Sequence, residues 1–479
     1  MVVKLQRPIL VGGLGLSFVL WLFSSLQDSL VQVGEVSLLS LIIVGGGLWF
    51  LKQNRVPTTI ESVENLPRDR ATVVSEISQA EVVVNCLANE AENHPLLTNL
   101  RQQVSNLETE IDRNEIKLAV TGGKSTGKTT LIQTLAANWQ PGINQAVSFE
   151  ETAPLFIQDA TNLKGIFASN DYVLFLVNGD ITSSEYQFLQ QLKTNNHRTT
   201  LVFNKQDQYS PDERTSIFLS LQQRMSGNVI TTSAAPLPIK VRQHSDDGSF
   251  QEYLEQPAPD TEKLQQHLLD VLTQQGQQLV WATTVRKARL LKFEAKNSLN
   301  TLRKERATPI TEQYQWIAAA AAFANPVPAL DLLATAAINA QMVMDLGNIY
   351  QQKFSLEQAK TVAAEMGGLM LKLGLVELST KAIGIVLKSN AVTFAVGGVI
   401  QGVSAAYLTR IAGLALVEYF QAQEIAIDTG NALNLDKLRQ TLQNVFQQNQ
   451  QISYLQGFIQ QGVKRLLPET EITLDHTPA

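Results

Sequence analysis

The sequence predicts an α/β domain with a mostly parallel sheet, preceded by a transmembrane helical hairpin and followed by an all-α apolar domain. Three observations support this prediction. Two uncharged runs lie near the N-terminus, short β-type runs alternate with helical stretches between residues 114 and 275, and the last third is rich in small and aliphatic residues but poor in charge. Alternating strands and helices are typical of parallel sheets that are covered on both faces.

The length and charge of the chain narrow the possibilities. A chain of 479 residues is too long for one compact core, so we expect several domains. The net charge of −6 gives no general attraction to nucleic acid, and we expect no nucleic-acid partner. The single cysteine, Cys86, cannot form an internal disulfide, which fits a reducing compartment.

The first 52 residues predict a two-span membrane hairpin. Residues 8–26 and 36–51 contain no charged side chain, and a transmembrane helix needs about 20 apolar residues. Basic residues precede the first run and follow the second, so both ends and the bulk of the chain are expected on the cytoplasmic side. We therefore expect a multi-pass integral membrane protein. A cleaved signal peptide is the alternative for the first run alone.

Residues 53–113 predict a polar linker and a helical neck. Apolar residues recur there at the spacing of a coiled-coil seam: Leu97, Leu100, Val104, Leu107 and Ile111. Two heptads do not establish a dimer. A helix packed on the neighbouring domain is the favoured interpretation over self-association.

A glycine-rich loop follows the first β-type run of the central domain, residues 114–275. Residues 122–129 read Gly-Gly-Lys-Ser-Thr-Gly-Lys-Thr, directly after the apolar run at 116–120. In this pattern backbone N–H groups surround nucleotide phosphates, the lysine reaches the β- and γ-phosphates, and the next hydroxyl binds Mg²⁺. The expected nucleotide contacts are Gly122, Gly123, Lys124, Ser125, Thr126, Gly127, Lys128, Thr129 and Thr130.

The later β-type runs place further polar residues beside this loop. Residues 154–158 are followed by Asp159, residues 172–177 form a continuous buried-type run, residues 199–203 are followed by Asn204, and residues 229–232 are followed by Ser233. Ligands of parallel sheets bind at the carboxyl ends of the strands. The sequence therefore predicts one site at one edge of the sheet.

The segment Asn204-Lys205-Gln206-Asp207 indicates a site that binds guanine in preference to adenine. A carboxylate at Asp207 can accept hydrogen bonds from guanine N1–H and from the exocyclic amine. Adenine presents a lone pair at N1 and would leave that charge unpaired. Asn204 is expected to bind the base edge and to hold loops together, and the Lys205 stem is expected to cover the ring face. We therefore expect GTP or GDP, with Mg²⁺, as the ligands.

On these motifs, residues 114–275 resemble the Ras-like and Era-like P-loop GTPases. The residues that match the family's motifs are Lys128, Thr129, Asp159, Asn204, Lys205, Asp207, Ser233 and Ala234. The resemblance implies a Ras-like G domain. It also implies that Asp159 supports the Mg²⁺ shell beside Thr129, and that the Ala234 backbone contacts the base.

Departures from the family's pattern bear on hydrolysis. The family's third motif is Asp-x-x-Gly, whose glycine N–H binds the γ-phosphate. Counted from Asp159, the fourth position is Asn162, and Leu163 stands where Ras-type enzymes place a water-orienting Gln. Residues 138–149 contain no threonine for a second Mg²⁺ contact. We therefore expect nucleotide binding with hydrolysis that is slow, partner-stimulated or absent, and we assign no catalytic residue.

Residues 276–307 predict a basic connector helix. Its basic residues are Arg286, Lys287, Arg289, Lys292, Lys296, Arg303, Lys304 and Arg306. Attraction to anionic lipid is one interpretation, and a solvated connector is the other. The sequence leaves both open.

Residues 308–425 predict an apolar helical domain, and residues 426–479 an amphipathic helix with a polar tail. The Pro-x-Pro turn at 326–328 and Ile349-Tyr350 resemble the YcjF-type domain of unknown function of some bacterial membrane-associated GTPases, which implies no known reaction. Residues 391–409 are uncharged and long enough to span a bilayer. The following Arg410 and the glycines of the run favour a buried or membrane-contacting bundle over another hairpin.

Together these features predict a membrane-anchored GTP-binding protein that acts as a nucleotide-dependent switch at the cytoplasmic membrane face, with slow or partner-stimulated GTP hydrolysis. The alternatives are a dynamin-like membrane-remodelling GTPase and a non-hydrolysing, nucleotide-gated membrane scaffold. The expected partners are the lipid bilayer, an unidentified protein and, through the helical regions, a second copy of the chain.

Overall fold

The computed structural model describes residues 66, 67, 69–156, 168–225, 229–244, 250–324, 328–388, 397–423, 434–449 and 452–466. The predicted membrane hairpin at residues 1–52 lies outside these residues, as do Asp159, Asn162 and Leu163.

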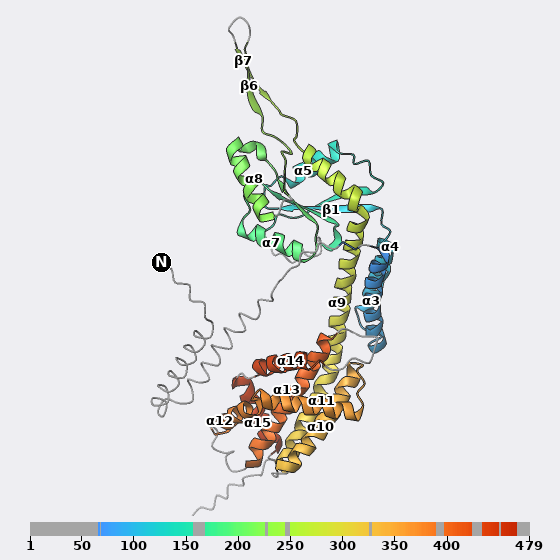
Figure 1. Ribbon diagram of the computed structural model, residues 1–479, viewed down its shortest axis with the longest axis vertical. Helices are drawn as coiled ribbons and strands as arrows, with labels where there is room; N and C mark the ends of the chain where they lie inside the picture. Colours follow the sequence, from blue (N-terminus) through green and yellow to red (C-terminus); the bar gives the residue numbers. More distant parts are fainter. Residues whose placement is uncertain are drawn as a thin grey trace, which may run out of the picture. The chain divides into compact units, whose positions relative to one another are not determined.

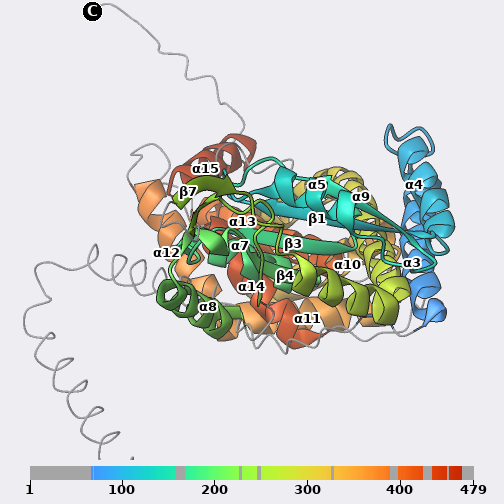
Figure 2. The same cartoon turned by 90° about the horizontal axis from the view of Figure 1, so that it is seen from above.

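The central domain is built on a five-stranded parallel sheet with the strand order β2-β1-β3-β4-β5. The strands are β1 (Glu115–Gly122), β2 (Ala146–Glu151), β3 (Tyr172–Val177), β4 (Thr199–Phe203) and β5 (Val229–Thr231). Each neighbouring pair is parallel, and Figure 2 shows β1, β3 and β4 side by side. The α/β fold predicted from the alternating pattern is thus confirmed.

Helices cover both faces of this sheet. On one face, α5 (Lys128–Asn138) and the first turns of α9 (Glu262–Ala324) pack on β1 and β3, and α9 contributes Leu264, Leu268 and Leu272. On the other face, α7 (Ser183–Thr194) and α8 (Pro211–Met225) pack on β3 and β4. The leucines of α9 recur every four residues and so form one apolar stripe.

The strand expected at residues 154–158 is not formed in its described part, since residues 154–156 are a loop and a turn. The strand at this place in the sheet is β2, which ends at Glu151. β2 is an edge strand with an outer face that is partly exposed, so its sequence alternates instead of forming an apolar run. Pro154 has no N–H for a sheet, and Phe156 has a φ of 66°, outside the β region.

An antiparallel hairpin stands between β5 and α9, and the sequence patterns did not predict it. Its strands are β6 (Ile239–His244) and β7 (Phe250–Glu255). Figure 1 shows it projecting from the parallel sheet.

The neck consists of α3 (Arg70–Glu90) and α4 (Leu97–Glu110), which lie alongside α9 (Figure 1). The predicted seam from Leu97 to Ile111 is buried in one core with Val285, Leu291 and Leu299 of α9. This arrangement agrees with the favoured interpretation, a helix packed on a neighbouring element.

The basic helix is part of α9, which is 63 residues long and extends beyond both predicted ends. Pro309 lies inside it. A proline in a helix removes one hydrogen bond, here the bond to the carbonyl of Glu305. Both residues are exposed, so water can serve that carbonyl.

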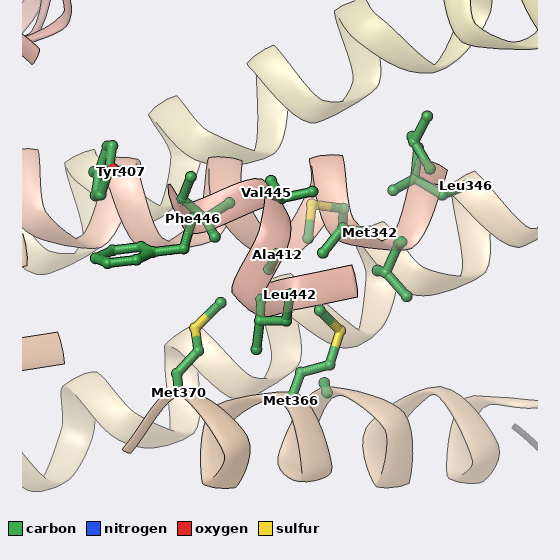
Figure 3. Close-up of a cluster of buried hydrophobic side chains, with 14 of the residues drawn as sticks. Met342, Leu346, Met366, Met370, Tyr407, Ala412, Leu442, Val445 and Phe446 are labelled. Carbon is green, nitrogen blue, oxygen red and sulfur yellow. The ribbon is translucent and has the colours of Figure 1, made fainter. Parts of the chain in front are cut away.

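The C-terminal part is helical, as predicted. It comprises α10 (Pro328–Ile349), α11 (Leu356–Lys372), α12 (Leu375–Lys388), α13 (Gly397–Ala422), α14 (Leu435–Asn449) and α15 (Ile452–Leu466). Figure 3 shows Met342, Met366, Met370 and Phe446 meeting in its core. The one amphipathic helix predicted within residues 426–479 is instead two helices, α14 and α15, and α14 buries Leu438, Leu442, Val445 and Phe446.

Helix α13 is the part of the described chain that is long and apolar enough to cross a membrane, over Gly398–Ala422. Of its most apolar window, 67% is buried. Its neighbours are α9, α10, α12, α14 and α15. The burial supports the bundle interpretation of this segment.

Candidate functional site

The loop between β1 and α5 has a conformation that requires its glycines. Gly122 has a φ of 148° and Gly127 a φ of 90°, and both values are unfavourable for residues with a side chain. A Cβ at Gly122 would collide with the carbonyl oxygen of Leu176, and one at Gly127 with the amide of Asn204. The loop is therefore tied closely to the ends of two other strands.

Lys128 begins α5 and turns back over this loop. Its side chain is buried, and Nζ donates to the carbonyl oxygens of Gly122 at 3.2 Å and Gly123 at 2.9 Å. Burial lowers the pKa of the ammonium group, and Glu151 opposes that shift. A cation at a helix N-terminus, beside free backbone N–H groups, favours an anion there.

A carboxylate lies beside the loop hydroxyl. Thr129 Oγ1 donates to Glu151 Oε1 at 2.9 Å. Glu151 is the last residue of β2, and the next residue, Thr152, donates from Oγ1 to Thr121 Oγ1 at 2.8 Å. Sequence reasoning missed Glu151 because it looked for the acidic residue after an apolar run. Counted from Glu151, the fourth position of the family's Asp-x-x-Gly motif would be Pro154, so neither the aspartate nor the glycine of that motif is present here.

Asn204 joins three loops at the carboxyl edge of the sheet. Its Nδ2 donates to the carbonyl oxygen of Thr126 at 2.9 Å. Its Oδ1 accepts from Thr232 Oγ1 at 3.1 Å and from the Ala234 N–H at 3.2 Å. Asn204 is only 1% exposed, so its amide serves as an internal brace between the loops.

Asp207 presents a carboxylate whose orientation is fixed by its neighbours. Oδ1 accepts from Ser233 Oγ at 2.7 Å, and Oδ2 accepts from the Leu237 N–H at 2.9 Å. Lys205 has a φ of 61°, and its Cε lies 3.7 Å from the position of a Cβ built on Gly127. The lysine stem therefore lies over the same loop.

The structure brings most of the sequence-predicted residues to one edge of the sheet. Asn204 and Lys205 meet the loop, Asp207 and Ser233 are bonded to each other, and Ala234 contacts Asn204. Lys124 and Ser125 are exposed on the loop, and Thr130 lies in the first turn of α5. Asp159 cannot be placed, since it lies outside the described residues.

Most of the predicted basic side chains of α9 bind acidic or polar groups of the protein. The ion pairs join Lys287 to Glu110 at 2.5 Å, Arg289 to Glu76 at 2.5 Å, and Arg303 and Arg306 to Glu90 at 2.6 and 3.3 Å. These pairs connect α9 to the neck and favour the connector interpretation over a lipid-binding face.

Arg286 lies near the start of β3, at the edge of the sheet opposite the loop at residues 122–129. It donates to the carbonyl oxygen of Asn170 at 2.8 Å. Burial lowers its pKa to about 10, with Asp171 acting in the opposite direction. It therefore remains a cation at neutral pH.

Fold and site define a P-loop α/β domain of GTPase-like architecture joined to a helical C-terminal region. Residues 286–451 match the family described as a domain of unknown function (DUF697). The match confirms the predicted YcjF-type resemblance, and it extends beyond the predicted range of 308–425 at both ends. No curated protein matches the chain.

Several solved structures are similar at low identity. One is an oligomerised bacterial dynamin pair described in connection with sensing and tethering of membranes, with 12% identity, 82% of this chain and 79% of that chain covered, and a TM-score of 0.24. The LeoA bacterial dynamin GTPase from ETEC has 10% identity, coverages of 82% and 98%, and a TM-score of 0.25. Translation elongation factor SelB from Methanococcus maripaludis has 17% identity and a TM-score of 0.23, and the match covers 26% of this chain and 30% of that one.

Proposed function

We propose that this chain is a GTP-binding protein that acts as a nucleotide-dependent switch at a membrane. The proposal depends on the hydrogen bonds of the Asn204 amide. They join Thr126, in the loop at residues 122–129 that would bind the phosphates (the phosphate-type loop), to Ala234, in the loop at residues 233–234 that would face the base (the base-type loop). A nucleotide needs the phosphate-binding loop and the base-binding loop at a fixed separation. A glycine turn that arose by chance would not be hydrogen-bonded to a guanine-binding motif.

The phosphates of the nucleotide would lie in the loop from Gly122 to Thr129. Lys128 would exchange its two carbonyl partners for phosphate oxygens. The base would lie against Lys205, with Asp207 accepting from guanine N1–H and the exocyclic amine. Ser233 supports this role because its hydroxyl holds Asp207 Oδ1 at 2.7 Å.

Oxygen ligands suited to Mg²⁺ are present beside the loop. The Thr129 hydroxyl and the Glu151 carboxylate lie 2.9 Å apart, and Mg²⁺ prefers carboxylate and hydroxyl oxygens together with phosphates. We propose Thr129 as a ligand and Glu151 as the carboxylate that supports the metal shell. Asp159 remains a proposal for the same role. The metal would neutralise phosphate charge.

Slow hydrolysis is proposed from the loop after β2. If Glu151 occupies the first position of the Asp-x-x-Gly motif, the fourth position is Pro154, which has no N–H to donate to a γ-phosphate. This observation supports a slow or partner-stimulated GTPase, and also favours the non-hydrolysing scaffold as the second candidate.

Membrane anchoring is proposed from the two uncharged runs within residues 1–52. A chain that starts at residue 53 should leave the carbonate-resistant membrane fraction. If it stays there, a later segment such as α13 spans the bilayer instead.

Nucleotide binding and turnover together test the function. Titration with GDP, ADP and XDP should show a clear preference for GDP, and comparable GDP and ADP affinities would overturn the guanine assignment. Turnover measured with and without liposomes then separates the candidates. Lipid-stimulated turnover indicates a dynamin-like remodeller, slow unstimulated turnover a switch, and tight binding without turnover a scaffold.

A further inference from the structure

The segment at residues 204–207, which would bind guanine, makes an additional contact that its sequence motif does not require. Gln206, the residue between Lys205 and Asp207, is only 7% exposed. Its Nε2 donates to Asp260 Oδ2 at 2.8 Å, and its backbone N–H donates to the carbonyl oxygen of Thr232 at 3.2 Å. An amide in this position is thus held by a residue that lies 54 positions further along the chain.

Asp260 also holds the second base-type loop. Its backbone exchanges two hydrogen bonds with Ser233, each of 2.9 Å. Ser233 in turn bonds Asp207 twice, because its Oγ donates to Oδ1 at 2.7 Å and accepts from the Asp207 N–H at 3.3 Å. Asp260 therefore contacts both loops that orient the Asp207 carboxylate.

The need for such a contact follows from the chain's course. Between Ser233 and Asp260 the chain leaves the sheet and forms the β6–β7 hairpin. Near the hairpin's base, Gln256 Nε2 donates to the carbonyl oxygen of Pro236 at 2.6 Å, and the Leu237 N–H donates to Asp207 Oδ2. An inserted segment of this length would let the base-type loop shift unless its two ends were joined.

We propose that Asp260 and Gln206 are positioning residues for guanine selection. The pair holds the loops at residues 204–207 and 233–234 at a fixed separation, so that the Asp207 carboxylate keeps one orientation when a base binds. Selection of a base depends on placing a charged acceptor within fractions of an ångström, whereas the phosphates are held separately by the loop at residues 122–129. This inference rests on the proposed function.

The test compares base selectivity with phosphate binding in the full-length protein. Dissociation constants are measured for GDP, ADP and inorganic tripolyphosphate with the unaltered chain and with Gln206→Met, Asp260→Ala and Asp260→Asn. We expect Gln206→Met and Asp260→Ala to weaken GDP binding about tenfold and to lower the GDP-to-ADP preference equally. Tripolyphosphate binding should change less than about twofold, since the lost contact is remote from the phosphates.

Two further variants sharpen the assignment. Asp260→Asn keeps an acceptor oxygen for Gln206, so this variant should retain most of the preference for GDP over ADP. The double variant Gln206→Met with Asp260→Ala should be no worse than either single change, since both remove one interaction. Glu252→Gln serves as the matched control, because it removes a hairpin carboxylate that pairs with Arg242 and Lys240 away from the base loops.

Retained guanine selectivity in Gln206→Met would overturn the inference, as would an equal loss of GDP and tripolyphosphate binding in both single variants. Either result would show that the pair serves stability only. A lack of guanine preference in the unaltered protein is a different outcome, since it would overturn the proposed function itself.

Discussion

The loop at residues 122–129 and the neck both contain basic side chains that bind groups of the protein, but the acceptors are neutral in the loop and charged in the neck. In the loop at residues 122–129, Lys128 bonds to two backbone carbonyls, which are neutral acceptors. In the neck, Arg303 and Arg306 of α9 bond to the carboxylate of Glu90. A lysine bound to carbonyls can exchange them for a phosphate, whereas Arg303 cannot leave without exposing a buried charge. The partner of a cation, more than the number of cations, indicates its role.

The largest expected effect is on nucleotide binding. Lys128→Ala should weaken GTP binding by about 30-fold to several thousand-fold, because truncating one member of a buried charge pair costs about 2–5 kcal/mol. Calorimetric titration measures the change. Lys193→Ala is the matched control, since Lys193 lies at the end of α7 with an exposed side chain and is not an expected nucleotide contact, and it should bind within a few fold of the unaltered chain. Normal GTP binding by Lys128→Ala would show that the loop is not the phosphate site.

In the neck, removing a buried cation should lower the stability of the fold. The side chains of Arg303 and Glu90 are 5% and 9% exposed, and Arg303 also stacks on Tyr350 at 5.7 Å. Arg303→Met leaves the largely buried Glu90 with the exposed Arg306 as its cation and Gln351 as a neutral donor at 2.9 Å, so the free energy of unfolding should fall by about 3 kcal/mol. Urea unfolding followed by circular dichroism tests this.

Lys304→Gln, an exposed neighbour on α9, is the control and should change stability only slightly. Nucleotide affinity should stay the same in both variants. If Arg303→Met unfolds at the same urea concentration as the unaltered chain, the ion pair contributes little and the contrast between the two regions fails.

How far the sequence predicted the molecule depended on whether the signal was local. The loop at residues 122–129 and the segment 204–207 were found because their glycines and polar residues lie at fixed spacing along the chain, and the structure brings them together through Asn204 and Thr126. The parallel sheet was also predicted, because buried strands such as β3 are continuous apolar runs.

The parts that escaped prediction depend on distant contacts. Glu151 lies at the end of an alternating edge strand, so no apolar run marked it. Asp260 meets Gln206 across 54 positions, and Arg303 meets Glu90 across 213. The hairpin β6–β7 is largely exposed and has no core-facing pattern of its own. Spacing within a motif can identify a ligand site, but it does not reveal which side chain far along the chain will pair with a given charge.

A moderate effect is expected at the base-reading carboxylate. Asp207→Asn should lower GDP affinity by about 10–100-fold and raise XDP affinity, because the amide can donate to the 2-oxo group of xanthine but cannot accept both guanine donors. Competition titrations with GDP, XDP and ADP measure this shift. The Leu237 N–H can donate to the oxygen of the new amide, and the Ser233 hydroxyl can accept from its nitrogen, so the fold should be retained. A uniform loss for all three nucleotides would instead indicate a disrupted loop.

The smallest expected effect decides between the two interpretations of the basic helix. Arg289 is 59% exposed while pairing with Glu76, and Lys292 donates to Gln79 at 2.9 Å. Exposed pairs contribute about 0.2–1 kcal/mol, so Arg289→Gln combined with Lys292→Gln should lower the free energy of unfolding by no more than about 1 kcal/mol. Binding of a chain lacking residues 1–52 to phosphatidylserine-containing vesicles should change less than about twofold, since these cations already have protein partners.

Were α9 a lipid-binding face, each charge would contribute about 1 kcal/mol, and removing two would weaken vesicle binding by about 30-fold. Glu76→Gln is the matched control, because it removes the partner and leaves both cations. It should have the same small effect on stability, and a marked gain in vesicle binding would show that the ion pair holds Arg289 away from lipid.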